Sequence, residues 1–135
     1  MILAIDTAST IIAIGLFWPK KIKKIKLFKS EKSSAKLLAK IDQFLKSNKI
    51  KPADLKAIIV NRGPGFFTGL RVGASIANTL GYALKIPTIG ITISEKKAGR
   101  RNNILKIIKK GYQKFRSGKV SPDSKILPIY YQNIE

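Results

Sequence analysis

The feature that most constrains the fold of this chain is residues 57–84, where a buried strand, a glycine-rich turn and a long helix follow one another. Residues 58–60 read Ile-Ile-Val, a β-branched run typical of a strand covered on both faces. Gly-Pro-Gly at residues 63–65 ends this strand, because glycine reaches backbone angles closed to other residues and proline lacks an amide donor. From Phe67 onward the apolar period becomes helical.

The helix predicted over residues 67–84 carries two neighbouring stripes at four-residue spacing. The first stripe is apolar and consists of Val72, Ile76, Leu80 and Leu84. The second has almost no side chain and consists of Gly69, Gly73, Ala77 and Gly81. Burial of each large side chain is worth roughly 1.5–3 kcal/mol, so we expect the apolar stripe to face the sheet and the small stripe to lie at its rim or outside. A crossing of the small stripe over the chain's own sheet or over the other helix is the alternative.

The remaining sequence predicts one α/β domain around this unit. Apolar runs bounded by turn residues predict further strands at residues 1–6, 11–18, 20–29 and 87–92. Helical spacing predicts an amphipathic helix between the capping residues 30–34 and the polar residues 47–48, and a basic helix over residues 100–119 that breaks near Gly111. The expected order is β-β-β-α-β-α-β in a five-stranded mixed sheet, followed by a basic helical segment.

The amino-acid composition excludes several kinds of site. The 135 residues contain no cysteine and no histidine, which removes disulfides, thiolate zinc sites, the usual catalytic triads and most imidazole metal sites. We therefore expect no metal and no cofactor. The longest apolar run, residues 11–18, is shorter than the roughly 20 residues of a membrane helix, and Asp6 interrupts the apolar start that a secretory signal needs. We expect a cytoplasmic protein without a membrane contact.

Positive charge is concentrated in two parts of the sequence. Lys and Arg number 27 against 7 Asp and Glu, a formal net charge of +20. Residues 20–56 and 96–125 hold nearly all the cations, whereas the segment between them contains only Arg62, Arg71 and Lys85. A basic surface attracts phosphate backbones or an acidic protein, but the excess of lysine over arginine is also what an AT-rich genome gives. The candidate RNA contacts are Lys20, Lys21, Lys23, Lys24, Arg100 and Arg101.

Two turns are candidates for binding an anion. Asp6 ends the first predicted strand and precedes Thr7, an arrangement that suits a phosphate or metal site, although an aspartate here can simply accept the amides of its own turn. The Gly-Pro-Gly turn delivers a helix N-terminus with free amides. It lacks the Lys-Ser/Thr of a P-loop and the spacing of a dinucleotide fingerprint, so a structural junction is the alternative. The residues of this second turn are Arg62, Gly63, Pro64, Gly65 and Thr68.

Two sequence blocks resemble the TsaB (YeaZ) family. The first is AIDTAS at residues 4–9, and the second, RGPGFFTGLRVG at residues 62–73, is similar to the family's R-G-P-G-S-F-T-G-[LV]-R-[IV]-G. Residues 86–92 are similar to the family's strand I-P-x-x-G-[IV]-[ST]. The resemblance covers residues 1–95. It implies a single lobe of the actin, sugar-kinase and Hsp70 (ASKHA) fold, whose element order is the one expected above.

The resemblance also implies a function. Members of this family are non-catalytic partners of TsaD in the synthesis of threonylcarbamoyladenosine in tRNA, and this chain lacks the metal-ligating histidines of TsaD-like proteins. In the family, the helix after the glycine turn packs against TsaD or a second TsaB copy. The matching residues here are Gly69, Arg71, Gly73, Ala77 and Gly81. We expect a TsaD-like partner, a homodimer in isolation, and loss of docking in Gly73→Leu with the apolar stripe intact.

The chain departs from the family in two places. Phe66 replaces the family's serine after Gly-Pro-Gly, and the segment after residue 95 is too short for a second lobe. We therefore divide the chain into a lobe, residues 1–95, and a basic helical segment with a tail, residues 96–135, that replaces the second lobe. LPIYYQN at residues 127–133 is similar to the family's closing P-[LV]-Y-L-R-N, which indicates an internal deletion. Because a nucleotide cleft needs both lobes, we expect no independent ATP binding.

Three functions are open to such a chain. The first is a scaffold subunit that docks TsaD or a copy of itself, and the second is a basic module that binds tRNA. The third is a minimal nucleotide-binding or hydrolase domain that uses Asp6 and the Gly-Pro-Gly turn. The first two can coexist, whereas the missing histidine and second lobe count against the third.

Overall fold

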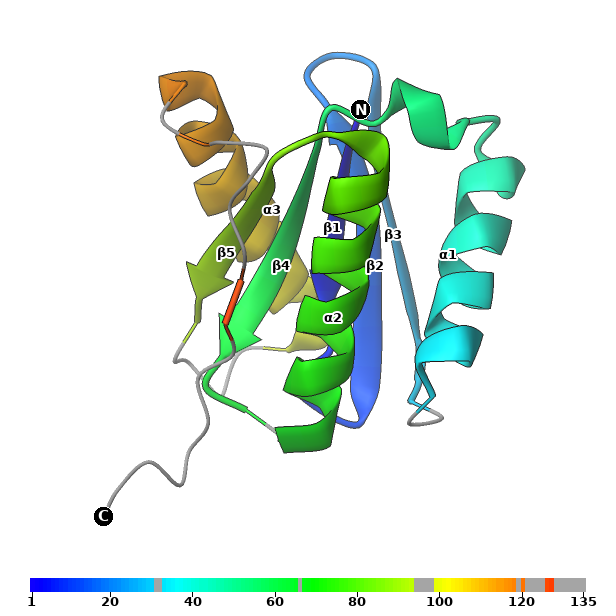
Figure 1. The fold of residues 1–135 in the computed structure, drawn as a ribbon, viewed down its shortest axis with the longest axis vertical. Coiled ribbons are helices and arrows are strands. Elements are labelled where there is room, and N and C mark those ends of the chain that lie inside the picture. Colours follow the sequence, from blue (N-terminus) through cyan, green and yellow to red (C-terminus); the bar gives the residue numbers. More distant parts are fainter. Residues whose placement is uncertain (31–32, 66, 94–98, 119, 121–125, 128–135) are drawn as a thin grey trace.

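The computed structural model has three layers, a central sheet with helices on both faces (Figure 1). It describes residues 1–30, 33–65, 67–93, 99–118, 120 and 126–127. Helices α1 (Ser34–Ser47) and α2 (Phe67–Leu84) cover one face, and α3 (Arg100–Ser117) covers the other. Phe66 and the tail residues 128–133 that resemble the family's ending lie outside the described residues.

The sheet has five strands in the order β3-β2-β1-β4-β5, which confirms the predicted mixed sheet. Its strands are β1 (Ile2–Asp6), β2 (Ile11–Trp18), β3 (Ile22–Lys29), β4 (Ala57–Gly63) and β5 (Thr88–Thr92). Strands β1, β2 and β3 form an antiparallel meander, and β4 pairs parallel to both β1 and β5. Because β1 and β4 are parallel, the polar turns that follow them lie at the same edge of the sheet.

The two faces of the sheet bury separate sets of apolar side chains. Along β1, Leu3 and Ile5 pack on the side of α1 and α2, whereas Ile2 and Ala4 pack on the side of α3. Both β1 and β4 are therefore buried on two faces, which explains their continuous apolar runs. Full burial of one such Leu or Ile side chain contributes roughly 1.5–3 kcal/mol. The turns at the carboxyl ends of β1 and β4 thus follow strands that are buried on both faces.

Helix α3 is continuous through Gly111, so the predicted break near this residue is wrong. Gly111 faces the sheet, and a Cβ atom there would lie 2.6 Å from Cγ1 of Ile59. The glycine allows α3 to approach β4 closely and does not end the helix. The helix ends at Gly118, whose φ of 71° closes it in the left-handed conformation.

Helix α3 belongs to the same packed unit as the strands that precede it. Its Ile104 and Ile107 are fully buried and pack against the sheet. The division of the chain after residue 95, and the role of the later segment as a replacement for a second lobe, stay predictions. Among the residues that the structure describes, no helix combines the length and apolar character needed to cross a bilayer.

Candidate functional site

The small residues of α2 face the chain's own sheet, so their predicted place at the rim or outside is wrong. Ala77 is completely buried, and Gly73 and Gly81 are buried as well. A Cβ atom at Gly73 would overlap Oγ1 of Thr7, and one at Gly81 would overlap Oγ1 of Thr88. The small stripe therefore touches the turn after β1 and the start of β5.

The physical reason is the close approach of α2 to the sheet. A Cβ atom at Gly69 would overlap the carbonyl oxygen of Thr7, and the Thr7 hydroxyl donates a 2.6 Å hydrogen bond to the Gly69 carbonyl. Larger side chains at this position would push the helix away from that contact. The apolar stripe of α2 is displaced toward α1. Its Ile76 is buried, and its three other residues are partly buried: Val72, Leu80 and Leu84.

The Gly-Pro-Gly turn packs directly against the turn between β1 and β2. A Cβ atom at Gly65 would lie 2.7 Å from the Cβ and the carbonyl oxygen of Ala8. Gly63 has a φ of 107°, in the region that favours glycine, and its peptide bond to Pro64 is cis. Thr68 is exposed at the start of α2. Both glycines thus serve the geometry of the junction, and an anion-binding role for this turn stays a prediction.

Asp6 connects the turns at the carboxyl ends of β1 and β4. Its Oδ1 accepts hydrogen bonds from the Ala8 amide, at 3.1 Å, and from Nδ2 of Asn61, at 3.0 Å. Oδ1 of Asn61 accepts in turn from the Gly63 amide, at 2.9 Å. Asn61 was not among the predicted site residues, and its only signal was a polar residue at the end of an apolar strand. These contacts agree with the interpretation that Asp6 accepts the amides of its turn.

The second carboxylate oxygen of Asp6 takes no part in these hydrogen bonds. Oδ2 of Asp6 is buried and accepts no hydrogen bond among the described residues. Over the same part of the chain, no group of three or more acidic, histidine or cysteine side chains comes together as a metal site. The Thr7 hydroxyl is already bonded to Gly69, so a phosphate role for Asp6 and Thr7 stays a prediction.

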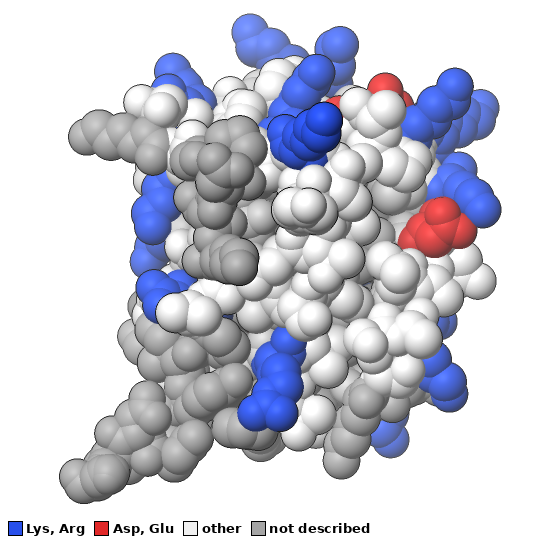
Figure 2. Space-filling model, in the orientation of Figure 1, with Lys and Arg blue, Asp and Glu red and all other residues white. Residues whose placement is uncertain are grey.

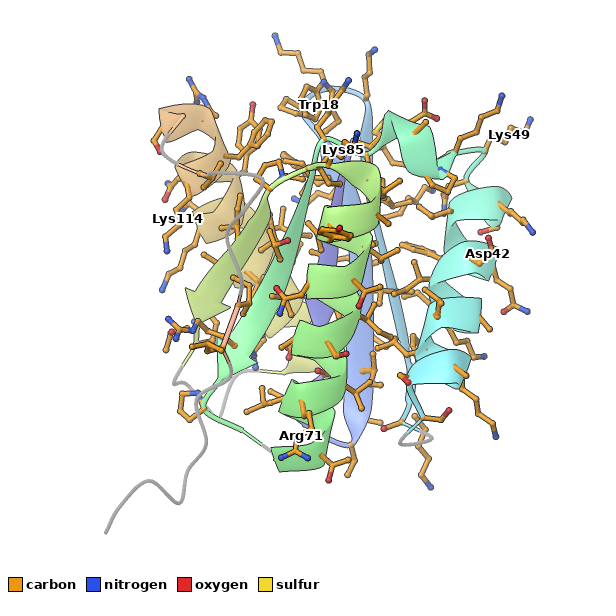
Figure 3. The ribbon with its side chains drawn as sticks, in the orientation of Figure 1. Trp18, Asp42, Lys49, Arg71, Lys85 and Lys114 are labelled. Carbon is orange, nitrogen blue, oxygen red and sulfur yellow. The ribbon has the colours of Figure 1, made fainter. Side chains whose placement is uncertain are left out.

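The two arginines of this region lie in different surroundings. Nε of Arg62 donates a 3.1 Å hydrogen bond to the carbonyl of Leu127. Asn78 of α2 holds the neighbouring Ile126 by two hydrogen bonds of 3.0 and 2.8 Å, so Arg62 and α2 both fix this part of the C-terminal segment. Arg71 is exposed in the first turns of α2 (Figure 3).

An apolar groove of about 480 Å³ lies between α1 and α2. Most of its lining is large and apolar: Leu38, Ile41, Leu45, Leu55, Leu80 and Leu84. Leu38 is 46% exposed although it belongs to the apolar pattern of α1. The groove was not predicted from the sequence, because it depends on the angle between α1 and α2, which sets how the apolar stripe of α2 contacts α1.

One lining residue of the groove is charged, Asp42, whose carboxylate pairs with Lys46 at 3.0 Å, and the surface over α2 carries little charge. Figure 2 shows a mostly uncharged area over α2, with cations along its borders. Arg71 and Lys85 mark the two ends of the helix (Figure 3), and between them Tyr82 is 86% exposed. We call the groove and the outward side of α2 together the α1–α2 face, which consists of the lining residues above with Ser75, Thr79 and Tyr82.

The predicted RNA contacts lie at opposite ends of the sheet. One group is exposed at the β2–β3 hairpin: Lys20, Lys21, Lys23 and Lys24. Arg101 is exposed in the first turn of α3, and the side chain of Arg100 lies outside the described part of the chain. The structure therefore brings the hairpin lysines together but does not bring Arg101 to them (Figure 1).

The hairpin meets the C-terminal half of α3. The ring of Trp18 lies 6.5 Å from that of Tyr112 and 6.2 Å from that of Phe115. The guanidinium of Arg116 lies 5.8 Å from the Tyr112 ring. With a rise of about 1.5 Å per residue, Arg101 lies about 20 Å from Phe115 along the helix. These aromatics are thus packed between α3 and the hairpin.

A sequence model of the family TsaD, tRNA N6-adenosine threonylcarbamoyltransferase, matches residues 28–97. The chain is 35% identical over 104 residues to the tRNA threonylcarbamoyladenosine biosynthesis protein TsaB of Buchnera aphidicola subsp. Schizaphis graminum (strain Sg), a match that covers 75% of this chain and 50% of that protein. It is 32% identical over 95 residues to the protein of the same name from Bacillus subtilis (strain 168), covering 70% and 42% respectively. The matches thus span half or less of the length of these relatives.

Solved structures with the same fold include YeaZ from Pseudomonas aeruginosa, with a TM-score of 0.62 and 24% identity over 67% of this chain and 43% of that chain. RuvC from Thermus thermophilus superposes with a TM-score of 0.56 and 12% identity, covering 89% of this chain and 98% of the other. At these identities the likeness establishes the fold alone, which is the predicted ASKHA-type lobe.

Proposed function

Because the chain belongs to the family of TsaD, tRNA N6-adenosine threonylcarbamoyltransferase, and within it to the TsaB (YeaZ) group, we propose that it is a non-catalytic scaffold subunit in threonylcarbamoyladenosine synthesis. In this role it docks a TsaD-type subunit, or a second copy of itself, through the α1–α2 face. The observation that carries the proposal is the apolar groove between the two helices, with Leu38 exposed beside it.

Two properties suit this face to docking. Apolar surface that a partner covers contributes roughly 25 cal/mol per Å², and a face with little charge avoids the cost of desolvating cations. Tyr82 adds an exposed aromatic side chain, a residue type enriched at protein interfaces. The chain as a whole has a net charge of +20, whereas the area over α2 in Figure 2 is mostly uncharged.

The mechanism of docking differs from the one that the sequence suggested. Gly69, Gly73 and Gly81 allow α2 to approach the sheet and are not available to a partner helix. They act indirectly, because the position of α2 determines where Leu80 and Leu84 meet α1 to form the groove. We therefore expect Gly73→Leu to unfold the chain, and docking must be tested at other positions.

The chemistry of the residues supports a non-catalytic subunit. The chain contains no histidine and no cysteine, the side chains that most often act as base or nucleophile. Asp6 is buried, and its Oδ1 accepts the Ala8 amide and Asn61 Nδ2. The Thr7 hydroxyl donates to the Gly69 carbonyl. The polar residues at the ends of β1 and β4 thus stabilise the junction with α2.

Leu38→Asp tests the docking proposal. The substitution replaces an exposed apolar side chain of the groove with a second carboxylate beside Asp42, so we expect the variant to lose capture of the purified TsaD-type subunit from the same organism. Gln43→Asp is the matched control, because Gln43 is exposed on the same helix and does not line the groove. Both positions are exposed, so both variants are expected to keep the circular dichroism spectrum and melting temperature of the unsubstituted chain.

Undiminished capture by a folded Leu38→Asp protein would contradict docking through this face. The isolated chain is tested in the same way by sedimentation velocity. A dimer that dissociates in Leu38→Asp and persists in Gln43→Asp supports docking of a second copy. A dimer that persists in both contradicts it.

A tRNA-binding module is the second candidate function. It is favoured by the exposed lysines of the β2–β3 hairpin, which lies beside Arg116 at the end of α3. Binding of tRNA that falls steeply with salt, and that the double variant Lys20→Glu/Lys21→Glu loses while Leu38→Asp keeps it, would distinguish this function from docking.

A further inference from the structure

A hollow lies between α3 and β5, on the side of the molecule away from α1 (Figure 1). Its volume is about 520 Å³, and its polar lining is formed by Arg62, Thr92, Lys110, Gln113, Lys114 and Ser117. β5 is the last strand in the order of the sheet. The hollow therefore combines a sheet edge with three cationic side chains.

The cations of this hollow come from two elements, β4 and α3, and Arg62 and Lys114 both approach Gly90. A Cβ atom at Gly90 would lie 3.0 Å from Cδ of Arg62, so the arginine of β4 passes closely over this residue. From α3, Nζ of Lys114 donates a 3.4 Å hydrogen bond to the Gly90 carbonyl. Lys110 lies one helical turn before it and lines the same hollow. Figure 3 shows Lys114 on the outer side of α3.

The chemistry of the lining points to an anion. Lys110 and Lys114 are like charges at i and i+4, an arrangement that destabilises a helix and that a bound anion relieves. Arg62 uses Nε for the Leu127 carbonyl and has two further guanidinium nitrogens, which suit two oxygens of one phosphate. Thr92 and Gln113 add neutral donors, and no carboxylate lines the hollow among the described residues.

We infer that the hollow at the edge of β5 binds a phosphate group, supplied by a nucleotide or by an RNA backbone. Its volume lies within the range of roughly 300–1,000 Å³ that ligand pockets occupy. The buried side chain of Ile91 adds an apolar contact. The site does not depend on a cleft between two lobes, so it is compatible with the loss of such a cleft.

This site is separate from the α1–α2 face. The two share no lining residue: the groove lies between α1 and α2, whereas the hollow lies at β5 and the C-terminal half of α3. A variant can therefore lose docking and keep phosphate binding, or lose phosphate binding and keep docking. The site also differs from the basic hairpin, whose lysines lie next to β2 at the other edge of the sheet.

Lys110→Glu and Lys114→Glu test the inference, with Lys109→Glu as the matched control. Lys109 is exposed on the same helix, undergoes the same change of charge and does not line the hollow. The probes are ATP, followed by calorimetry, and a labelled single-stranded RNA oligonucleotide, followed by fluorescence anisotropy at one salt concentration. We expect each variant of the hollow to lower affinity about tenfold or more, and the control to change it about twofold or less.

A selective loss of ATP and RNA binding assigns the hollow to phosphate groups of both sources. A selective loss of RNA binding by a chain that does not bind ATP assigns it to the RNA backbone. An equal effect of Lys109→Glu and Lys110→Glu, or no binding of either probe, would overturn the inference. Lys114→Gln, which removes the charge without reversing it, and circular dichroism of every variant separate loss of binding from loss of folding.

Discussion

A glycine inside a helix costs roughly 1 kcal/mol relative to alanine, yet α2 contains Gly69, Gly73 and Gly81. Each lies where a Cβ atom would overlap an oxygen of Thr7 or Thr88. The close contact between α2 and the sheet, with its 2.6 Å hydrogen bond from Thr7 to Gly69, offsets that cost in helix propensity. At the scale of single residues, glycine is required at these positions because Thr7 and Thr88 leave no space for a larger side chain.

Gly73→Ala is expected to destabilise the chain by about 1–3 kcal/mol, although alanine is the better helix former. The added methyl group meets Oγ1 of Thr7, which must move and weaken its bond to Gly69. Urea denaturation of the variant measures the loss. Thr79→Ala, at an exposed position of the same helix, is expected to change the free energy of unfolding by about 0.5 kcal/mol or less.

A double-mutant cycle identifies the contact responsible. Combined with Thr7→Ala, which removes the overlapping hydroxyl, Gly73→Ala is expected to cost less than it does alone. Strictly additive effects of the two substitutions would show that the cost of Gly73→Ala has another origin.

Helices α2 and α3 show how far a pattern of residues can be interpreted for a whole element. Their extent and amphipathic character were predictable, because helical spacing of apolar residues is local information. Two interpretations of glycine were wrong: Gly111 does not break α3, and the small stripe of α2 does not face outward. In both helices a glycine allows close packing on the sheet, and the sequence does not show which side of a helix the sheet occupies.

Gly111→Ala tests this role in α3. We expect a loss of about 1–3 kcal/mol, because the new methyl group would overlap the side chain of Ile59. In an Ile59→Ala background the space is already open, so the further effect of Gly111→Ala should fall to zero or become favourable. An equal cost in both backgrounds, measured by denaturant titration, would argue against packing as the reason for the glycine.

The whole molecule distributes its charge unevenly. The net charge is +20, but the area over α2 is mostly uncharged and cations lie along its borders. The excess of positive charge disfavours the compact state through self-repulsion, and added salt screens it over a Debye length of about 10 Å at 0.1 M. The same repulsion opposes association of two copies except through a face with little charge.

The melting temperature is accordingly expected to rise as sodium chloride increases from low concentration to about 0.15 M, because screening relieves the repulsion between cations. Differential scanning calorimetry at a fixed pH measures this. Sulfate at equal ionic strength is expected to raise the melting temperature further by binding to an anion site of the folded chain. A melting temperature that falls with sodium chloride would mean that attractive ion pairs outweigh the repulsion.

The sequence by itself determined the order of the elements, the mixed sheet and the family, because each rests on local periodicity or on a contiguous motif such as residues 62–73. Only the tertiary structure decided that the small stripe of α2 contacts Thr7 and Thr88 and that Asn61 donates a hydrogen bond to Asp6. It also decided where the groove between α1 and α2 and the hollow between α3 and β5 lie. These features depend on the angle and distance between elements. Packing of the complete chain determines both, and no single segment encodes them.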